Sequence, residues 1–60
     1  MTPKQILKLR KTLGLTQQQL ADRIGAARES VARWETGLHP PQGANLKALR
    51  EMAAKKGTRW

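Results

Sequence analysis

The side chains that carry most enzyme chemistry are scarce in this chain and poorly spaced for catalysis. His39 is the only histidine, and no second type of metal ligand stands near it at the spacing of a metal site. Ser30 has no histidine at a spacing that would let it serve as the base for a nucleophile. The chain has no cysteine, which excludes a disulfide framework and a thiolate metal site. We therefore expect no enzyme activity, no metal site and no cofactor.

The basic side chains indicate binding chemistry instead. Twelve Lys and Arg residues stand against four Asp and Glu, which gives a net charge of +8 and a pI near 11.4. In a small domain this excess is typical of a protein that binds a polyanion. Charge alone leaves nucleic acid, an anionic membrane surface and an acidic protein open as partners. No stretch approaches the ~20 apolar residues of a membrane span, and the N-terminal segment is too polar for a signal peptide.

Helices must position these side chains, and the middle of the chain predicts two short ones joined by a tight turn. Thr16 is a suitable N-cap, and Gln19 stands three residues later to complete a capping box. Gly25 suits the left-handed backbone that ends a helix. A second periodic run over 28–36 then stops at Gly37. Two short helices with so few residues between them must cross steeply, as in a helix-turn-helix.

Two further helices complete the expected fold. Pro3 suits the first position of a helix that Gly14 ends. Two prolines bar a helix around position 40, and a last helix is expected over about 43–56. The predicted fold is all-α, a compact bundle of four to five short helices. It forms one domain over residues 1–57, followed by a C-terminal tail over 58–60.

Apolar residues at helical spacing predict which faces form the core. In the first helix the expected stripe is Ile6, Leu9 and Leu13, and in the last helix it is Leu46, Leu49 and Met52 or Ala53.

The spacing within the two middle helices is specific. Counted from Gln17, the small residue Ala21 is fifth, Gly25 is ninth, Val31 is fifteenth and Trp34 is eighteenth. This spacing, with the segments LGLTQQQLADRIG and SVARWETG, resembles the phage repressor/Cro-type (xenobiotic-response-element-like) helix-turn-helix family. The resemblance covers most of the chain and implies a lambda-repressor-like DNA-binding domain. An ordinary pair of helices with glycine at the turn is the alternative. The residues that would build the unit are Thr16, Leu20, Ala21, Ile24, Gly25, Val31 and Trp34.

The resemblance implies that helix 28–36 enters the major groove of duplex DNA with its N-terminal residues at the base edges. Arginine can pair with guanine, glutamate can accept from cytosine, and an alanine methyl can meet a thymine methyl. The implied base-contacting residues are Ala27, Arg28, Glu29 and Arg33. Arg28 has a phosphate contact as its alternative. For Glu29 and Arg33 the alternative to base contact is an i,i+4 ion pair with each other, which would contribute only ~0.2–0.5 kcal/mol to helix stability.

Phosphate contacts are expected beside the base contacts, because the start of the preceding helix has free N–H groups and a positive dipole end. In the family the loop after helix 28–36 also meets the DNA backbone, but here that loop has no Lys or Arg. Basic residues from elsewhere must therefore contribute. A solvated face is the alternative for the lysines of the first helix. The expected phosphate-contacting residues are Gln17, Gln18, Ser30, Arg10, Lys11 and Arg23.

Three residues have structural roles in this interpretation. The resemblance implies a partly buried ion pair between Arg10 and Glu35 that ties the first helix to the third. Trp34 is expected in the core, not as a ring that stacks on bases. The start of helix 28–36 has alanine where the family prefers Ser or Thr, and a missing N-cap costs on the order of 1 kcal/mol.

The function expected from the resemblance is sequence-specific DNA binding by a transcriptional repressor. A homodimer would read half-sites about 34–36 Å apart. The candidates for its surface are the last helix, over about 43–56, and the tail, with Leu38, Met52 and Trp60. The expected location is the cytoplasm, in association with the nucleoid, or the host cytoplasm if a phage encodes the protein. One alternative is the DNA-binding antitoxin of a toxin–antitoxin pair, whose main partner is a toxin protein. Another is a basic membrane-surface peptide, which leaves the spacing of the glycines unexplained.

Overall fold

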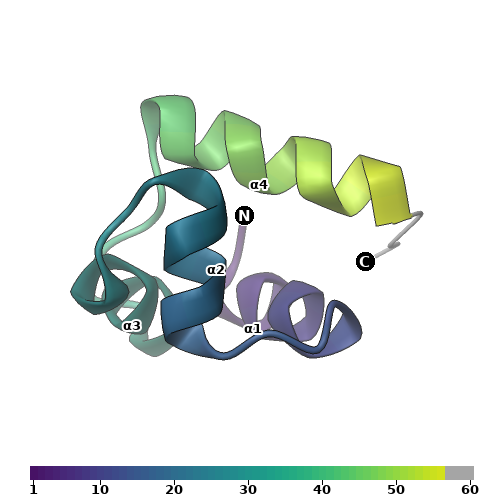
Figure 1. Cartoon of the computed structure of the whole chain (residues 1–60). Coiled ribbons are helices and arrows are strands. Elements are labelled where there is room, and N and C mark those ends of the chain that lie inside the picture. The colour runs from purple at the N-terminus through teal and green to yellow at the C-terminus, as the bar shows by residue number, and fades with distance from the viewer. Residues whose placement is uncertain (57–60) are drawn as a thin grey trace.

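The computed structural model describes residues 1–56, and over this range the chain forms four α-helices and no strand (Figure 1). The last residue of the predicted domain, Gly57, and the predicted tail over 58–60, with Trp60, lie outside the described residues. The all-α prediction is confirmed. The helices are α1 (Pro3–Thr12), α2 (Gln17–Ile24), α3 (Arg28–Thr36) and α4 (Gly43–Lys56).

Short-range hydrogen bonds fix the beginning of α2. The Thr16 hydroxyl accepts from the backbone N–H of Gln19 at 3.1 Å, and the Gln19 side-chain oxygen accepts from the backbone N–H of Thr16 at 2.8 Å. This reciprocal pair satisfies two N–H groups that have no partner within the helix. Thr16 is thus the cap, and the helix itself begins one residue later, at Gln17.

Left-handed glycines end the two middle helices. Gly25 has φ +73° and Gly37 has φ +85°, in a region that L-residues with a β-carbon rarely adopt. The first helix ends slightly earlier than its apolar stripe predicts. Leu13 is the C-cap of α1, and its side chain is half-buried because it lies where the chain leaves the helix.

All four helices contribute to one core. Trp34 is only 5% exposed, in agreement with its expected core position. The prediction for Leu46 is wrong in degree, because its side chain is half-buried and Leu49 lies at the centre of the α4 contact instead. Ile24 is also half-buried and packs against the edge of the core. The buried core residues are Ile6, Leu9, Leu20, Ala21, Val31, Trp34, Leu49 and Ala53.

α2 packs most extensively against α3 and also contacts α4, and α1 packs against α3. In Figure 1, α4 crosses the top of the molecule, and α1 and α3 lie below it. The domain measures 26 × 20 × 20 Å. No helix in residues 1–56 has the length and apolar character needed to cross a bilayer.

Candidate nucleic-acid interface

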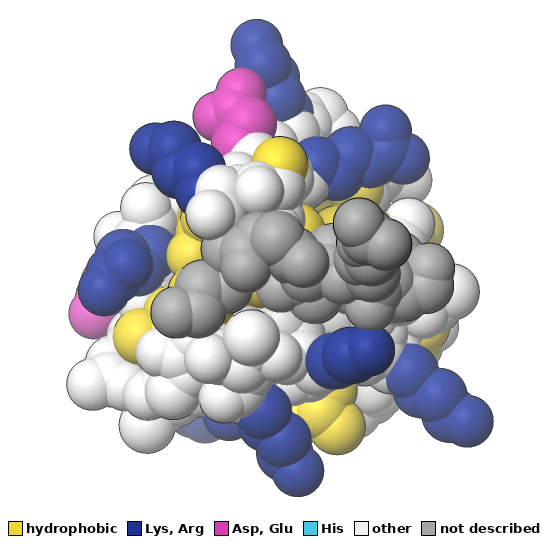
Figure 2. All heavy atoms as spheres, turned by 90° about the vertical axis from the view of Figure 1, so that its right-hand side faces the viewer, with side chains coloured by type: hydrophobic (Ala, Val, Ile, Leu, Met, Phe, Trp, Pro, Cys, Tyr) yellow, Lys and Arg dark blue, Asp and Glu magenta, His cyan; other side chains and the backbone are white. Residues whose placement is uncertain are grey.

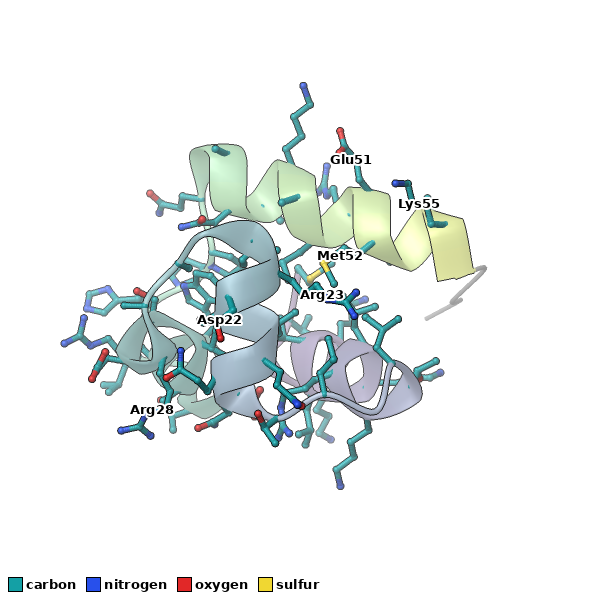
Figure 3. All side chains as sticks on the ribbon, viewed as in Figure 1. Asp22, Arg23, Arg28, Glu51, Met52 and Lys55 are labelled. Atoms are coloured by element: carbon teal, nitrogen blue, oxygen red, sulfur yellow. The ribbon has the colours of Figure 1, made fainter. Side chains whose placement is uncertain are left out.

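The exposed side of α3 carries the side chains that the sequence assigned to base contacts. Val31 and Trp34 turn one side of the helix into the core. The opposite side is therefore open, and Arg28 extends away from the body of the molecule at the lower left of Figure 3. All four predicted base-contacting residues are exposed: Ala27, Arg28, Glu29 and Arg33. The contacts of these four residues with particular bases stay predictions.

Glu29 and Arg33 do not form the ion pair that their spacing allows. Both side chains are exposed, and the structure has no salt bridge between them. At about 100° per residue, Arg28 and Arg33 lie about 140° apart around the helix axis. Neither guanidinium group has a hydrogen-bond or salt-bridge partner among the described residues, and the two extend in different directions from the helix.

The start of α3 has no side-chain cap. Ala27 is the N-cap residue, in an extended conformation, and no side chain accepts from the first N–H groups of the helix. The Ala27 carbonyl accepts from the N–H of Ser30 at 3.0 Å, which tightens the first turn. Free N–H groups at this end are favourable near an anion.

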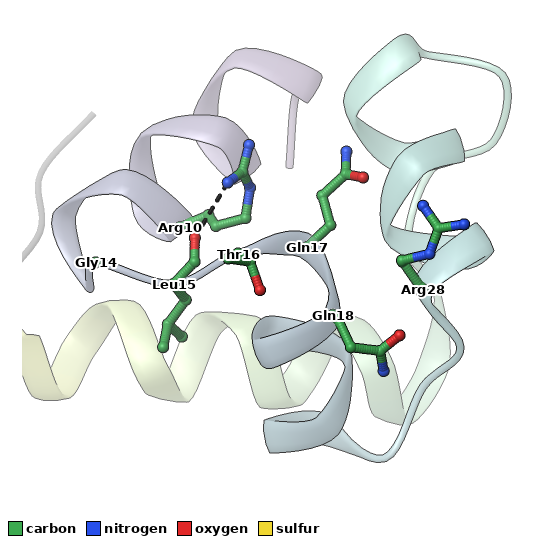
Figure 4. Close-up of a pocket in the computed structure, with 7 residues that line it drawn as sticks. All are labelled: Arg10, Gly14, Leu15, Thr16, Gln17, Gln18 and Arg28. Atoms are coloured by element: carbon green, nitrogen blue, oxygen red, sulfur yellow. Dashed lines mark hydrogen bonds between the residues drawn. The ribbon is translucent and has the colours of Figure 1, made fainter.

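A second feature of the interface is an open hollow of about 480 Å³ between the start of α2 and Arg28 (Figure 4). The backbone N–H groups of Gln17 and Gln18 have no acceptor among the described residues. Helix N-termini of this kind attract phosphate groups. The hollow thus joins free N–H donors with two arginines from other helices. Its lining residues are Arg10, Gly14, Leu15, Thr16, Gln17, Gln18 and Arg28.

Arg10 is held inside the protein by three hydrogen bonds. Its Nε donates to Glu35 Oε2 at 2.8 Å, and Nη2 donates to Glu35 Oε1 at 3.1 Å. Nη1 donates to the Leu15 carbonyl at 3.1 Å, the dashed line of Figure 4. The hydrogen bonds to Glu35 raise the pKa of Arg10 above its ordinary value, although desolvation opposes them. The ion pair is partly buried, with side chains 19% and 10% exposed, and it joins α1 to α3.

The side chain of Gln17 extends this ion pair into the hollow. Its amide nitrogen donates to Glu35 Oε1 at 3.4 Å, a long bond that leaves one amide hydrogen for another acceptor. Gln18, in contrast, donates to Asp22 at 2.9 Å, which explains why Asp22 lies along α2 and not toward the hollow. The contact between Gln17 and Glu35 was not expected from the sequence.

The structure gives two of the residues expected at phosphates, Arg10 and Arg23, neighbours within the protein, and their phosphate contacts stay predictions. Arg10 has its charge neutralised by Glu35, so its role is to hold α1 and α3 together at the edge of the hollow. Arg23 lies in the last turn of α2 beside Met52 and Lys55, on the other side of the molecule from Arg28 (Figure 3). Both expectations followed from the lack of Lys and Arg in the loop after helix 28–36, which does not indicate where the other basic residues lie in the molecule.

The remaining expected contacts fit the surface but stay predictions. Lys11 is exposed in the last turn of α1, and Ser30 is half-buried in the first turn of α3. The acceptor role of the Leu15 carbonyl has no sequence signal, because it depends on the path of the link between α1 and α2.

Comparisons with known proteins agree with this geometry. The helix-turn-helix family matches residues 6–56, most of the chain. A segment of 32 residues is 47% identical to an uncharacterized helix-turn-helix-type transcriptional regulator of Methanothermobacter thermautotrophicus, covering 53% of this chain and 46% of that protein. The match therefore spans less than half of the relative. No solved structure matches the chain significantly. The chain belongs to the Cro/C1-type helix-turn-helix family, a family of DNA-binding regulators.

Proposed function

We propose that the protein binds double-stranded DNA in a sequence-specific manner and acts as a transcriptional repressor by occupying an operator. The observation that carries the proposal is the pairing of two features on one side of the molecule. The exposed face of α3 carries Arg28 and Arg33, which have no partner within residues 1–56, and the N–H groups at the start of α2 line a hollow beside Arg28. Base-reading donors and a phosphate site are the two parts that such binding needs.

In this proposal α3 lies in the major groove with its first turn at the base edges. Arg28 and Arg33 each donate to guanine O6 and N7, Glu29 accepts from cytosine N4, and the Ala27 methyl meets a thymine methyl. Glu29 lies between the two arginines in sequence and has no salt bridge with Arg33 in the free protein. It is therefore available to a base without first giving up an internal contact.

The phosphate beside this groove would sit in the hollow at the start of α2. It would accept from the backbone N–H groups of Gln17 and Gln18 and from the free hydrogen of the Gln17 amide. Ser30 and Lys11 would add donors on either side. The Arg10–Glu35 pair would hold these parts in register without contacting DNA strongly itself.

We also propose that the protein acts as a homodimer on DNA, because one small domain buries too little surface for high specific affinity. Leu38 supports this proposal, because its side chain is 72% exposed in the loop that follows α3. A two-fold contact through this loop would set two α3 helices on one face of the duplex, about 34–36 Å apart. Such a protein would act in the cytoplasm, at the nucleoid.

The decisive experiment is selection of bound sequences from a random DNA pool, followed by competition assays on the enriched duplex. A near-palindrome with guanine at two positions in each half is the expected result. Arg28→Ala should weaken the enriched duplex by ~1–3 kcal/mol and relax the preference at one or two positions. Lys4→Ala, which removes an exposed charge on α1, is the matched control and should retain the preference. If no sequence is enriched, or if Arg28→Ala weakens all sequences equally, the proposed base reading is wrong.

A further inference from the structure

Much of the positive charge of the chain lies away from α3. The outer side of α4 carries Lys47, Arg50 and Lys55, all exposed, and Glu51 is the one carboxylate among them. None of the three cations forms a salt bridge with Glu51 or with another described carboxylate. Lys47 and Arg50 also border a shallow hollow of about 500 Å³ on the helix surface. This set of side chains is called the α4 surface below.

The α4 surface and α3 lie on different sides of the molecule, and Lys and Arg side chains are spread around its outline in Figure 2. Figure 1 shows α4 across the top of the molecule, with α3 at the lower left. Lys55 and Arg28 extend from opposite corners in Figure 3, and the domain is 26 Å in its longest dimension. At physiological salt the Debye length is about 8 Å, so the far end of α4 contributes little to a duplex held on α3. This charge is available for another partner.

The polarity of the α4 surface indicates the chemistry of that partner. Its exposed apolar residues are alanines, Ala44 and Ala54, and the nearby Leu46 is half-buried. A protein interface normally has apolar or aromatic anchors at its centre, and a helix that lies in a membrane needs bulky apolar side chains on one face. Surfaces that bind nucleic acid are instead polar and strongly positive. The composition of α4 fits the last kind.

A second copy of the chain is a poor occupant of the same surface. In a two-fold contact the same patch meets itself, so Lys47, Arg50 and Lys55 would face their own copies. Like charges brought together in this way repel one another. The exposed Leu38, outside α4, is the better candidate for self-association.

We propose that the α4 surface binds the phosphate backbone of a second DNA duplex, so that one molecule holds two segments of DNA together. The first segment rests on the function proposed above, with α3 in its major groove. From Lys47 to Lys55 the helix rises about 12 Å, at 1.5 Å per residue. Each strand of a duplex carries one phosphate per ~3.4 Å of helix axis, so the three cations can face more than one phosphate. This contact reads no sequence.

A pull-down assay tests the proposal. The duplex enriched by selection, or random duplex if none is enriched, is immobilised and saturated with protein, and the recovery of a fluorescent duplex of unrelated sequence is measured. The wild-type protein should recover the second duplex, and recovery should fall as salt rises. Lys47→Gln/Arg50→Gln should lower recovery at least fivefold while binding to the first duplex changes less than twofold. Glutamine is a good helix former, and circular dichroism checks that α4 persists.

Two controls separate the α4 surface from net charge and from α3. Lys4→Glu lowers the net charge by as much as the double variant does, at an exposed position of α1, and should retain recovery. Arg28→Ala/Arg33→Ala should lose selectivity for the enriched duplex but still bind unrelated duplex through α4. If the enriched duplex is never found while the α4 variant still loses recovery, sequence-specific binding through α3 fails and the contact of the α4 surface with DNA stands.

Three results would overturn the proposal. The first would be that the wild-type protein recovers no second duplex. The second would be that Lys4→Glu and the α4 variant lower recovery equally, because recovery would then depend only on net charge. The third is binding to vesicles that contain phosphatidylserine, lost in the α4 variant, without any capture of a second duplex. That result would assign the α4 surface to an anionic membrane.

Discussion

Replacement of Glu35 by glutamine tests how much the ion pair between α1 and α3 stabilises the domain. Glutamine keeps the volume and one acceptor oxygen but leaves Arg10 without its counter-charge. Exposed pairs contribute ~0–1 kcal/mol, whereas removal of one partner of a buried pair costs ~3–5 kcal/mol. With side chains 19% and 10% exposed, this pair lies between the two limits. We expect Glu35→Gln to lower the free energy of unfolding by ~2 kcal/mol.

Thermal unfolding followed by circular dichroism measures this effect. At about 4–8 °C per kcal/mol for a domain of this size, Tm should fall by roughly 8–16 °C. Glu51→Gln is the matched control, because Glu51 is exposed and makes no salt bridge with the described residues, and its Tm should change little. Arg10→Met and the double variant complete a cycle that isolates the pairwise term. If Glu35→Gln lowers Tm no more than Glu51→Gln, the pair is only a surface contact.

The pH dependence of the same effect has a definite sign. Glu35 raises the pKa of Arg10, so the contribution of Arg10 is fully present below its ordinary pKa and is lost only as the pH rises through the higher folded value. The difference in stability between wild type and Glu35→Gln should therefore stay constant between about pH 7 and pH 10.

Three further substitutions test the local structure through the free energy of unfolding in urea. Ala27→Ser should raise it by about 0.5–2 kcal/mol, because the extended Ala27 has no capping side chain; no gain would show that the first turn of α3 frays regardless. Gly25→Ala should lower it by about 1–2 kcal/mol, because alanine is strained at the left-handed φ of +73°. No atom lies within 4 Å of an added β-carbon, so the effect measures backbone strain alone, and an unchanged midpoint would refute that strain. Leu20→Ala should lower it by about 2–5 kcal/mol, whereas Leu38→Ala, at a 72% exposed side chain, should change it little.

The sequence predicts the helix boundaries well because the signals that set them are local. Thr16 and Gln19 are three residues apart, and their reciprocal hydrogen bonds need nothing from the rest of the fold. Gly25 and Gly37 end their helices through their own φ angles. The core positions of Leu20 and Trp34 follow from helical periodicity, which needs only the element type.

The sequence predicts less about which surfaces lie side by side. Gln17 meets Glu35 across 18 positions of sequence, and the Leu15 carbonyl reaches Arg10 only through the path of a short link. The position of Arg23 in the molecule is of the same kind. Its outward position on α2 follows from periodicity, but the crossing of α2 with α4 decides that it lies beside Lys55.

The position of the charges also changes what the net charge of +8 means for DNA binding. Glu35 neutralises Arg10, the cations of α4 lie on another side, and α3 itself offers Arg28 and Arg33 beside Glu29. Affinity for any duplex rises with each phosphate that a cation neutralises, so a face with two arginines and one carboxylate attracts DNA only weakly in general. Tight binding at α3 must then come from hydrogen bonds that fit particular base edges. The low net positive charge of the α3 face therefore favours selectivity for particular sequences over affinity for any duplex.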